Sequence, residues 1–170
     1  ISASFNEETV ESTTALTTDG SLVLFTWTND EGKKAFWHSS AHLLAQALEQ
    51  LYPGIKLTIG PAIEKGFYYD VDFGDVVFAE KDLKEVEVRM LEIARGKHEF
   101  SLRDSSKADA LAYYKNQGNE YKVELIEGLD DGTITFCDHD SFTDLCRGGH
   151  IPNTGIIKAI KLMSIAGAYW

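Results

Sequence analysis

The spacing of apolar residues predicts two long helices, each with one buried face. From residue 34 to residue 52, apolar side chains recur at intervals of four, three, four and three: Trp37, Ala41, Leu44, Leu48 and Leu51. This spacing places them on one side of a helix, which Pro53-Gly54 ends. From residue 80 to residue 94 a second stripe recurs, before a terminating Gly96: Leu83, Val86, Met90 and Ile93. Both segments are therefore predicted as amphipathic helices.

Shorter apolar segments predict strands. The expected strands cover residues 22–27, 56–63, 66–73, 98–104, 133–137, 143–147 and 156–165. A third helix should begin after a cap at Ser105 or Ser106, and a short fourth helix should cover residues 120–129. Because short turns join several strands, we expect an α+β fold with helices packed on an antiparallel or mixed sheet, rather than a parallel doubly wound fold.

The first thirty residues differ from the rest of the chain. They are rich in Thr, Ser and Glu, contain one predicted strand, and are followed by a predicted linker at residues 29–32. A segment of this length cannot bury a core of its own. We expect residues 1–30 to be part of a small module or an extra strand, and residues 31–170 to form the main domain.

Composition limits the function. The net charge of −11 argues against a free-standing nucleic-acid binder, because phosphate contacts require clustered Lys and Arg. A nucleic-acid substrate held mainly by other domains stays open. With only two cysteines, a reducing cytoplasm is favoured over secretion. The apolar runs are too short for a membrane span. The first residue is Ile1, with no leader pattern after it, and we expect the chain to be a piece of a longer protein.

Two short segments carry metal-ligating side chains. His38 and His42 lie four residues apart on the first predicted helix, so their rings share one side. Cys146 and His150 are also four apart, within a glycine-containing loop. Alone, each pair has a structural explanation: histidines on an exposed helix flank, and a buried free cysteine. Together, the four side chains form a tetrahedral zinc set. Ser39 occupies the place of the zincin glutamate, which excludes that protease class.

Other polar residues are weaker candidates. Asp144, Lys122 and Tyr69 could take part in chemistry, but a turn cap, a solvated cation and a core aromatic explain them equally well. His98 and His139 have no evident role. The Asp138-His139-Asp140 triplet predicts a surface turn, with a weak cation site as the alternative.

These residues, in this order, resemble the editing domain of threonyl-tRNA synthetase. The shared segments are HSSAHLLA at 38–45, IGP at 59–61, GFYYD at 66–70, YKV at 121–123, DLCRG at 144–148 with His150, PNT at 152–154, KLM at 161–163 and AGAYW at 166–170. The match covers residues 33–170, and its His/Cys segments also occur in alanyl-tRNA editing proteins. Residues 1–30 resemble, more weakly, the end of the ubiquitin-like (TGS-like) module that precedes this domain in bacterial threonyl enzymes.

The resemblance implies a proofreading hydrolase of the cytoplasm. Its substrate would be threonine-specific tRNA whose 3′ end carries serine in error, and its reaction would be hydrolysis of that ester by a positioned water. Serine lacks one methyl group of threonine, a difference that gives a binding site only about 1–3 kcal/mol of discrimination. A second, hydrolytic site would correct the error. The implied partners are the tRNA and the catalytic and anticodon-binding domains of the same full-length chain, with no membrane.

The resemblance also implies roles for individual side chains. Lys122, Asp144 and His150 would position the water and the terminal ribose. The pocket that excludes threonine would be lined by His38, His42 and Cys146. The remaining residues of the expected site would bind the aminoacyl-adenosine end: Tyr69, Arg147 and Gly148. We favour water activation without a metal or other cofactor; zinc on His38, His42, Cys146 and His150 is the alternative.

One position departs from the family. The family segment reads Cys-Arg-Gly-Pro-His, whereas this chain has Gly149 in place of the proline. We expect this glycine to loosen the loop and shift His150, and a shift of about 1 Å can cost roughly a hundredfold in rate. Two other functions therefore stay open, namely a zinc module that only positions tRNA and an interaction module whose site has decayed.

Overall fold

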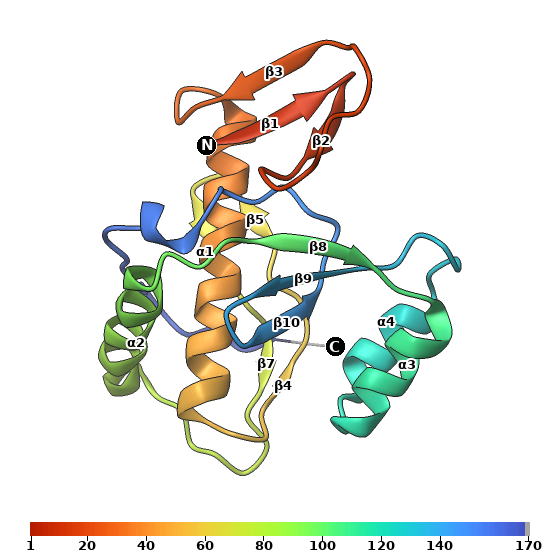
Figure 1. Ribbon diagram of the computed structural model, residues 1–170. Coiled ribbons are helices and arrows are strands. Elements are labelled where there is room, and N and C mark those ends of the chain that lie inside the picture. Colours follow the sequence, from red (N-terminus) through yellow and green to blue (C-terminus); the bar gives the residue numbers. More distant parts are fainter. Residues whose placement is uncertain (169–170) are drawn as a thin grey trace.

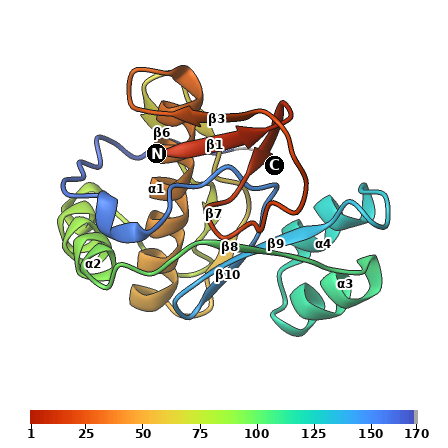
Figure 2. The same ribbon diagram turned by 45° about the horizontal axis from the view of Figure 1, so that its top comes forward.

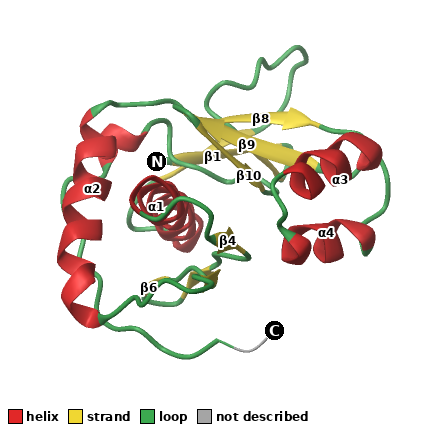
Figure 3. Ribbon diagram, turned by 90° about the horizontal axis from the view of Figure 1, so that it is seen from below, coloured by secondary structure: helices red, strands yellow, loops and turns green. Residues whose placement is uncertain are grey.

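The computed structural model describes residues 1–168, in which one long helix occupies the centre (Figure 1). The helices of this range are α1 Asp30–Leu51, α2 Leu83–Arg95, α3 Lys107–Asn116 and α4 Glu120–Glu127, with short 3₁₀ turns η1 Glu80–Asp82 and η2 Thr154–Ile156. Viewed along its axis, α1 lies between α2, the strands at residues 101–104, 135–139 and 142–145, and the segment of residues 56–72 (Figure 3). Tyr169 and Trp170, which end the AGAYW segment, lie outside the described residues.

Helix α1 is buried on more than the single face that was predicted. Ala41 and Leu48 are buried as expected, but Trp37, Leu44 and Leu51 are only half-buried. Its middle is rich in small residues, which let neighbouring elements approach closely. The buried Ser39 and Ser40 hydroxyls donate to carbonyl oxygens one turn earlier in the helix, so they carry no unsatisfied donor.

The N-terminal segment contains more structure than predicted. Three antiparallel strands form a sheet in the order β2-β1-β3 beside the start of α1 (Figure 2): β1 Ser2–Phe5, β2 Glu8–Val10 and β3 Leu22–Phe25. Helix α1 begins at Asp30, so the predicted linker at residues 29–32 is wrong. Acidic Asp30 and Glu31 in its first turn suit the positive end of the helix dipole.

The main sheet is antiparallel, in the order β10-β9-β8, and crosses one side of α1: β8 Ser101–Asp104, β9 Thr135–His139 and β10 Phe142–Leu145. The two predicted strands after α1 are each broken into short pieces: β4 Lys56–Leu57, β5 Ala62–Ile63, β6 Gly66–Phe67 and β7 Val71–Asp72. No strand follows η2 within the described residues, so the strand predicted at 156–165 is wrong. The α+β class is confirmed.

The core has one large cluster and two smaller ones. The large cluster packs α1 against α2, Phe100 and the β9–β10 side: Leu43, Ala47, Leu48, Val86, Met90, Ile93, Cys137, Cys146, Ile151 and Ile157. A second cluster joins α3 and α4 to β9 through Tyr114, Ile126 and Phe136. Within residues 1–168, no helix has both the length and the apolar character required to cross a membrane.

Candidate active site

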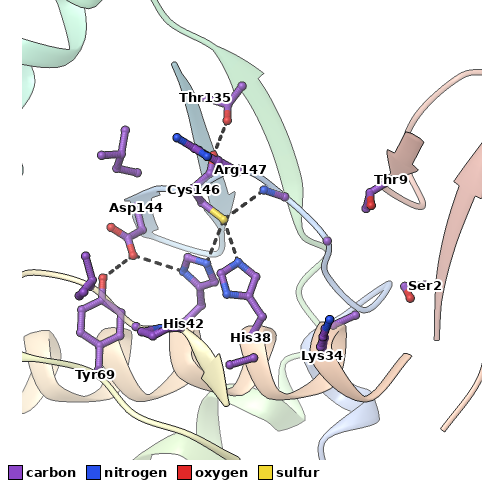
Figure 4. Close-up of a pocket in the computed structure, with 18 of the residues that line it drawn as sticks. Ser2, Thr9, Lys34, His38, His42, Tyr69, Thr135, Asp144, Cys146 and Arg147 are labelled. Carbon is purple, nitrogen blue, oxygen red and sulfur yellow. Dashed lines mark hydrogen bonds and ion pairs between the residues drawn. The ribbon is translucent and has the colours of Figure 1, made fainter. Parts of the chain in front are cut away.

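The two predicted metal-ligating segments meet around one sulfur atom. Cys146 Sγ lies 3.0 Å from His38 Nε2, 3.3 Å from His42 Nε2 and 3.3 Å from His150 Nε2. Helix α1 provides the first two rings, and Figure 4 shows them rising from it towards Cys146. The Gly148 backbone N–H also donates to this sulfur, over 3.3 Å. The predicted His/Cys cluster therefore exists as a set of direct contacts.

Strand alternation explains why Asp144 and Cys146 face the same helix. Phe142, Asp144 and Cys146 are buried, while Thr143 and Leu145 between them are half-buried. Successive side chains of a strand point to opposite faces, so the buried residues share the face towards α1. A short sequence segment thus supplies a carboxylate and a thiol to one side of the sheet.

Cys146 is electrostatically suited to carry a thiolate. A hydrogen bond from Cys137, with the neighbouring imidazoles, lowers the pKa of Cys146 well below its usual value although burial opposes this. The same hydrogen bond and burial raise the pKa of Cys137. Both cysteines are free and buried. We therefore assign the negative charge to Cys146 and the proton to Cys137.

His150 is held between two anionic groups. Its Nδ1 atom lies 3.0 Å from Glu11 Oε1, and its Nε2 atom contacts Cys146. Burial lowers the pKa of His150, but the hydrogen bonds to Cys146 and Glu11 outweigh it and raise the pKa to about 9. His42 has no such support at Nδ1, and burial lowers its pKa. Two imidazoles on the same sulfur thus differ in protonation.

Lys122, Asp144 and Tyr69 form a second polar group beside the cluster. Lys122 Nζ lies 2.6 Å from Asp144 Oδ1 and 3.3 Å from the Tyr69 hydroxyl, which donates to Asp144 Oδ2. Asp144 Oδ2 is also 3.5 Å from His42 Nδ1, too far for a good hydrogen bond. Burial and the Asp144 carboxylate raise the pKa of Tyr69 well above its usual value. Lys122 and Asp144 are only 2% and 3% exposed.

The cap of α4 places Lys122. The Asn119 side chain accepts a hydrogen bond from the Lys122 backbone N–H over 3.1 Å and donates to Leu57 O over 2.8 Å. This ties the first turn of α4 to β4. A cation in the first turn of a helix opposes the dipole, at a cost of about 0.3–1 kcal/mol. The Asp144 carboxylate offsets that cost, so the lysine is positioned by its ion pair and not by helix preference.

These groups border one cavity of about 740 Å³. The predicted site residues in its wall are His38, His42, Tyr69, Lys122, Asp144, Cys146, Arg147 and Gly148. Ser2 and Thr9 of the N-terminal segment lie across the cavity from them (Figure 4). His150 is not among the lining residues; its ring stacks on Phe100, with centroids 5.0 Å apart, behind Cys146.

Two residues near the site differ from expectation or were missed. The surface turn predicted at 138–140 is wrong for His139, which lies on β9 and is 2% exposed. Neither of its ring nitrogens has a hydrogen-bond partner among the described residues, and burial lowers its pKa to about 3. Glu11 was not predicted at all. No local pattern distinguishes it from the other acidic residues of its segment, because its role depends on contacts far along the chain.

The His/Cys cluster also fits a metal ion. One donor atom from each of His38, His42, Cys146 and His150 lies within 4.8 Å of the others. Zinc prefers such nitrogen and sulfur donors, and a tetrahedral ion would hold sulfur and nitrogen about 3.6 Å apart, slightly wider than the contacts here. Carboxylates lie near Nδ1 of two of the rings, at 3.0 Å in His150 and 3.5 Å in His42. Such outer partners commonly orient metal-binding histidines.

One segment of the chain matches a known family of domains. Residues 134–168 match the family described as "Threonyl and Alanyl tRNA synthetase second additional domain". Within these residues the match confirms the predicted resemblance. The match includes Asp144, Cys146 and His150, while the two histidines of α1 lie outside it.

Whole-chain comparisons point to one kind of enzyme. Over all 170 residues, the chain is 69% identical to a threonine–tRNA ligase of Flavobacterium psychrophilum and 68% identical to one of Flavobacterium johnsoniae. A threonine–tRNA ligase of Cytophaga hutchinsonii is 55% identical over the same length. The chain spans about a quarter, 26%, of the length of each of these relatives.

Proposed function

We propose that this chain is the proofreading segment of a threonine–tRNA ligase, and that it hydrolyses the ester of tRNA(Thr) mischarged with serine. The observation that carries the proposal is the juxtaposition, in one cavity wall, of the Cys146 cluster and the Lys122–Asp144–Tyr69 group. The relatives are threonine–tRNA ligases, whose reaction product is the correct counterpart of this substrate. We propose further that the chain is joined to the other domains of the ligase and that the ligase is cytoplasmic.

The ester reaction needs a positioned water and a donor for the developing negative charge. An ammonium group has three donors, and Lys122 directs two of them to Asp144 and Tyr69. The third is free to donate to the ester oxygen, where a fixed charge in a dry site is most effective. His38, half-buried in the cavity wall, accepts the proton of the attacking water at Nδ1, because its Nε2 donates to the Cys146 thiolate. The departing ribose oxygen takes up a proton from the same group, which balances the reaction.

The remaining residues would hold and select the aminoacyl end. Arg147 and Gly148 border the cavity, and in this proposal they would contact the terminal ribose and phosphate. His42 and Cys146 lie beyond the site of the water, where they would close the space that the threonine methyl group needs. His150, behind the sulfur, would act through Cys146 rather than on the substrate. A local cation such as Arg147 is needed because the chain has a net charge of −11.

A zinc-containing site is the second candidate, favoured by the Glu11 carboxylate beside Nδ1 of His150. His38, His42, Cys146 and His150 would hold the ion. If a water or the ester replaced one of these four ligands, zinc would lower the pKa of that water or polarise the ester oxygen. The same ion could instead serve folding alone, in a module that only positions tRNA. The favoured mechanism remains the metal-free one, because the lysine and carboxylate pair provides the required charge.

The test is a deacylation assay on the whole ligase with seryl-tRNA(Thr), before and after treatment with a chelator and verified removal of metals. The proposal expects serine release well above spontaneous hydrolysis in both samples. Release only before treatment would replace the metal-free mechanism by the zinc one. Seryl-tRNA that is bound but stays intact in both samples would contradict the proposed function.

A further inference from the structure

One buried carboxylate of the N-terminal segment contacts the loop that carries His150. Glu11 follows β2 and is 6% exposed. Its Oε1 atom accepts hydrogen bonds from the backbone N–H groups of Gly149, over 2.7 Å, and His150, over 3.3 Å. The same oxygen lies 3.0 Å from His150 Nδ1. Burying a carboxylate is costly unless it is well bonded, and all of these bonds go to the loop that carries the site histidine.

The backbone of this loop allows the contact only because residue 149 is glycine. Gly149 has φ of +88°, in the region that other residues rarely adopt, and Gly148 before it has φ of +92°. A proline at 149 would require φ near −65° and would have no N–H to donate. The Glu11–Gly149 bond is therefore incompatible with proline. With glycine at this position, the loop is hydrogen-bonded to Glu11.

One side chain, that of His150, connects Glu11 to the sulfur atom of Cys146. Glu11 contacts His150 Nδ1, and the opposite ring nitrogen of His150 contacts Cys146 Sγ over 3.3 Å. Phe100 stacks on the ring at an angle of 8° and keeps it from turning away. A carboxylate at Nδ1 keeps a proton on that nitrogen and fixes the orientation of the ring. Glu11 itself does not line the cavity.

We propose that Glu11 is a positioning residue of the hydrolytic site, which holds the 147–150 loop through Gly149 and orients His150 against Cys146. The proposal rests on the proposed function for its effect on rate, but the contact itself can be tested without any substrate. It makes the N-terminal segment a part of the site. Ser2 and Thr9, which lie in the cavity wall, belong to the same segment.

The test compares Glu11→Ala and Glu11→Gln in the whole ligase, with Glu8→Ala as the control. Glu8 is an exposed carboxylate of the same segment, so its removal changes the charge equally. We expect Glu11→Ala to lower kcat for seryl-tRNA deacylation by about a hundredfold, the effect of a displacement of about 1 Å, with KM changed much less. Glu11→Gln keeps an acceptor oxygen, so its kcat should be at least tenfold higher than that of Glu11→Ala. Glu8→Ala should leave kcat for seryl-tRNA deacylation unchanged.

Two readouts need no substrate. Amide hydrogen exchange at Gly149 should become at least tenfold faster in Glu11→Ala, and the ring Nδ1–H of His150, which is hydrogen-bonded to Glu11 in the wild type, should exchange faster with water in ¹⁵N NMR spectra. Unchanged exchange at both N–H groups would overturn the inference, whatever the activity. An equal loss of kcat in Glu11→Gln and Glu11→Ala would also overturn the inference. Failure of the wild-type ligase to deacylate seryl-tRNA would contradict the proposed function only, because the exchange and NMR results would still judge Glu11.

Discussion

Replacing Lys122 by methionine tests how the charged half of the site is held. Methionine keeps most of the apolar stem but leaves Asp144 without its cation, in a pair whose side chains are 3% and 5% exposed. Removing one partner of a buried pair costs about 3–5 kcal/mol. Because Tyr69 still donates to Asp144, we expect a loss near 3 kcal/mol in the free energy of unfolding. For a domain of this size that lowers Tm by about 6–12 °C.

The same chain offers a matched control. Lys56 and Glu120 form an ion pair of nearly equal length, 2.7 Å, but their side chains are 33% and 61% exposed. Exposed pairs contribute about 0–1 kcal/mol, so Lys56→Met should change stability by less than that. Urea unfolding followed by circular dichroism measures both variants. Equal losses for the two lysines would refute the argument that burial makes the Lys122 pair critical.

A double variant separates the charge from the packing. Lys122→Met combined with Asp144→Leu removes both charges, and replacing a whole buried pair by apolar side chains is often neutral or stabilising. We expect the double variant to be more stable than Lys122→Met alone by at least about 1.5 kcal/mol, although it should be inactive. Additive losses would show that the two groups do not interact.

Three further predictions concern neighbouring residues. The pKa of His139 falls from 6.5 to about 3 on folding, so its contribution to stability is present above pH 6.5 and is lost as the pH falls. Between pH 7 and pH 5 we expect the free energy of unfolding, measured in urea, to decrease by about 2 kcal/mol, and by less in His139→Phe. Iodoacetamide at pH 7 should label Cys146 before Cys137 in peptide mass spectra, because the thiolate is the reactive form; the opposite order would contradict the assigned charge. If the alternative zinc site is correct, added zinc should bind with one equivalent by calorimetry, and His42→Ala, which removes one ligand, should weaken that binding at least tenfold; absence of binding would rule the zinc site out.

Local patterns predicted the helices well. The third helix starts after Ser106, whose hydroxyl accepts from the Asp109 N–H, as a capping signal indicates. Spacing alone also placed His38 and His42 on one side of α1. The strands were harder, because the strand predicted at 56–63 is interrupted at Gly60-Pro61 and the alternation at 66–73 continues through a break in pairing.

The missed parts of the site depend on contacts distant in sequence. Glu11 and His150 are separated by 139 positions, and nothing near Glu11 marks it as buried. His139 lies between two aspartates, a pattern typical of a surface turn, but β9 is covered by α1 on the side where this ring points. The sequence also does not reveal that the Gly149 N–H has a carboxylate partner, because that partner lies far away along the chain.

The most direct measurement of the central claim is the ratio of deacylation rates for seryl- and threonyl-tRNA(Thr) under single-turnover conditions, with the whole ligase in excess. One methyl group is worth about 1–3 kcal/mol, so a site shaped against it should release serine roughly 10–200 times faster than threonine. In the proposed site, Cys146 and His42 would close the space for the methyl group and so set this ratio. Equal rates for the two esters, or no release of serine at all, would contradict the account.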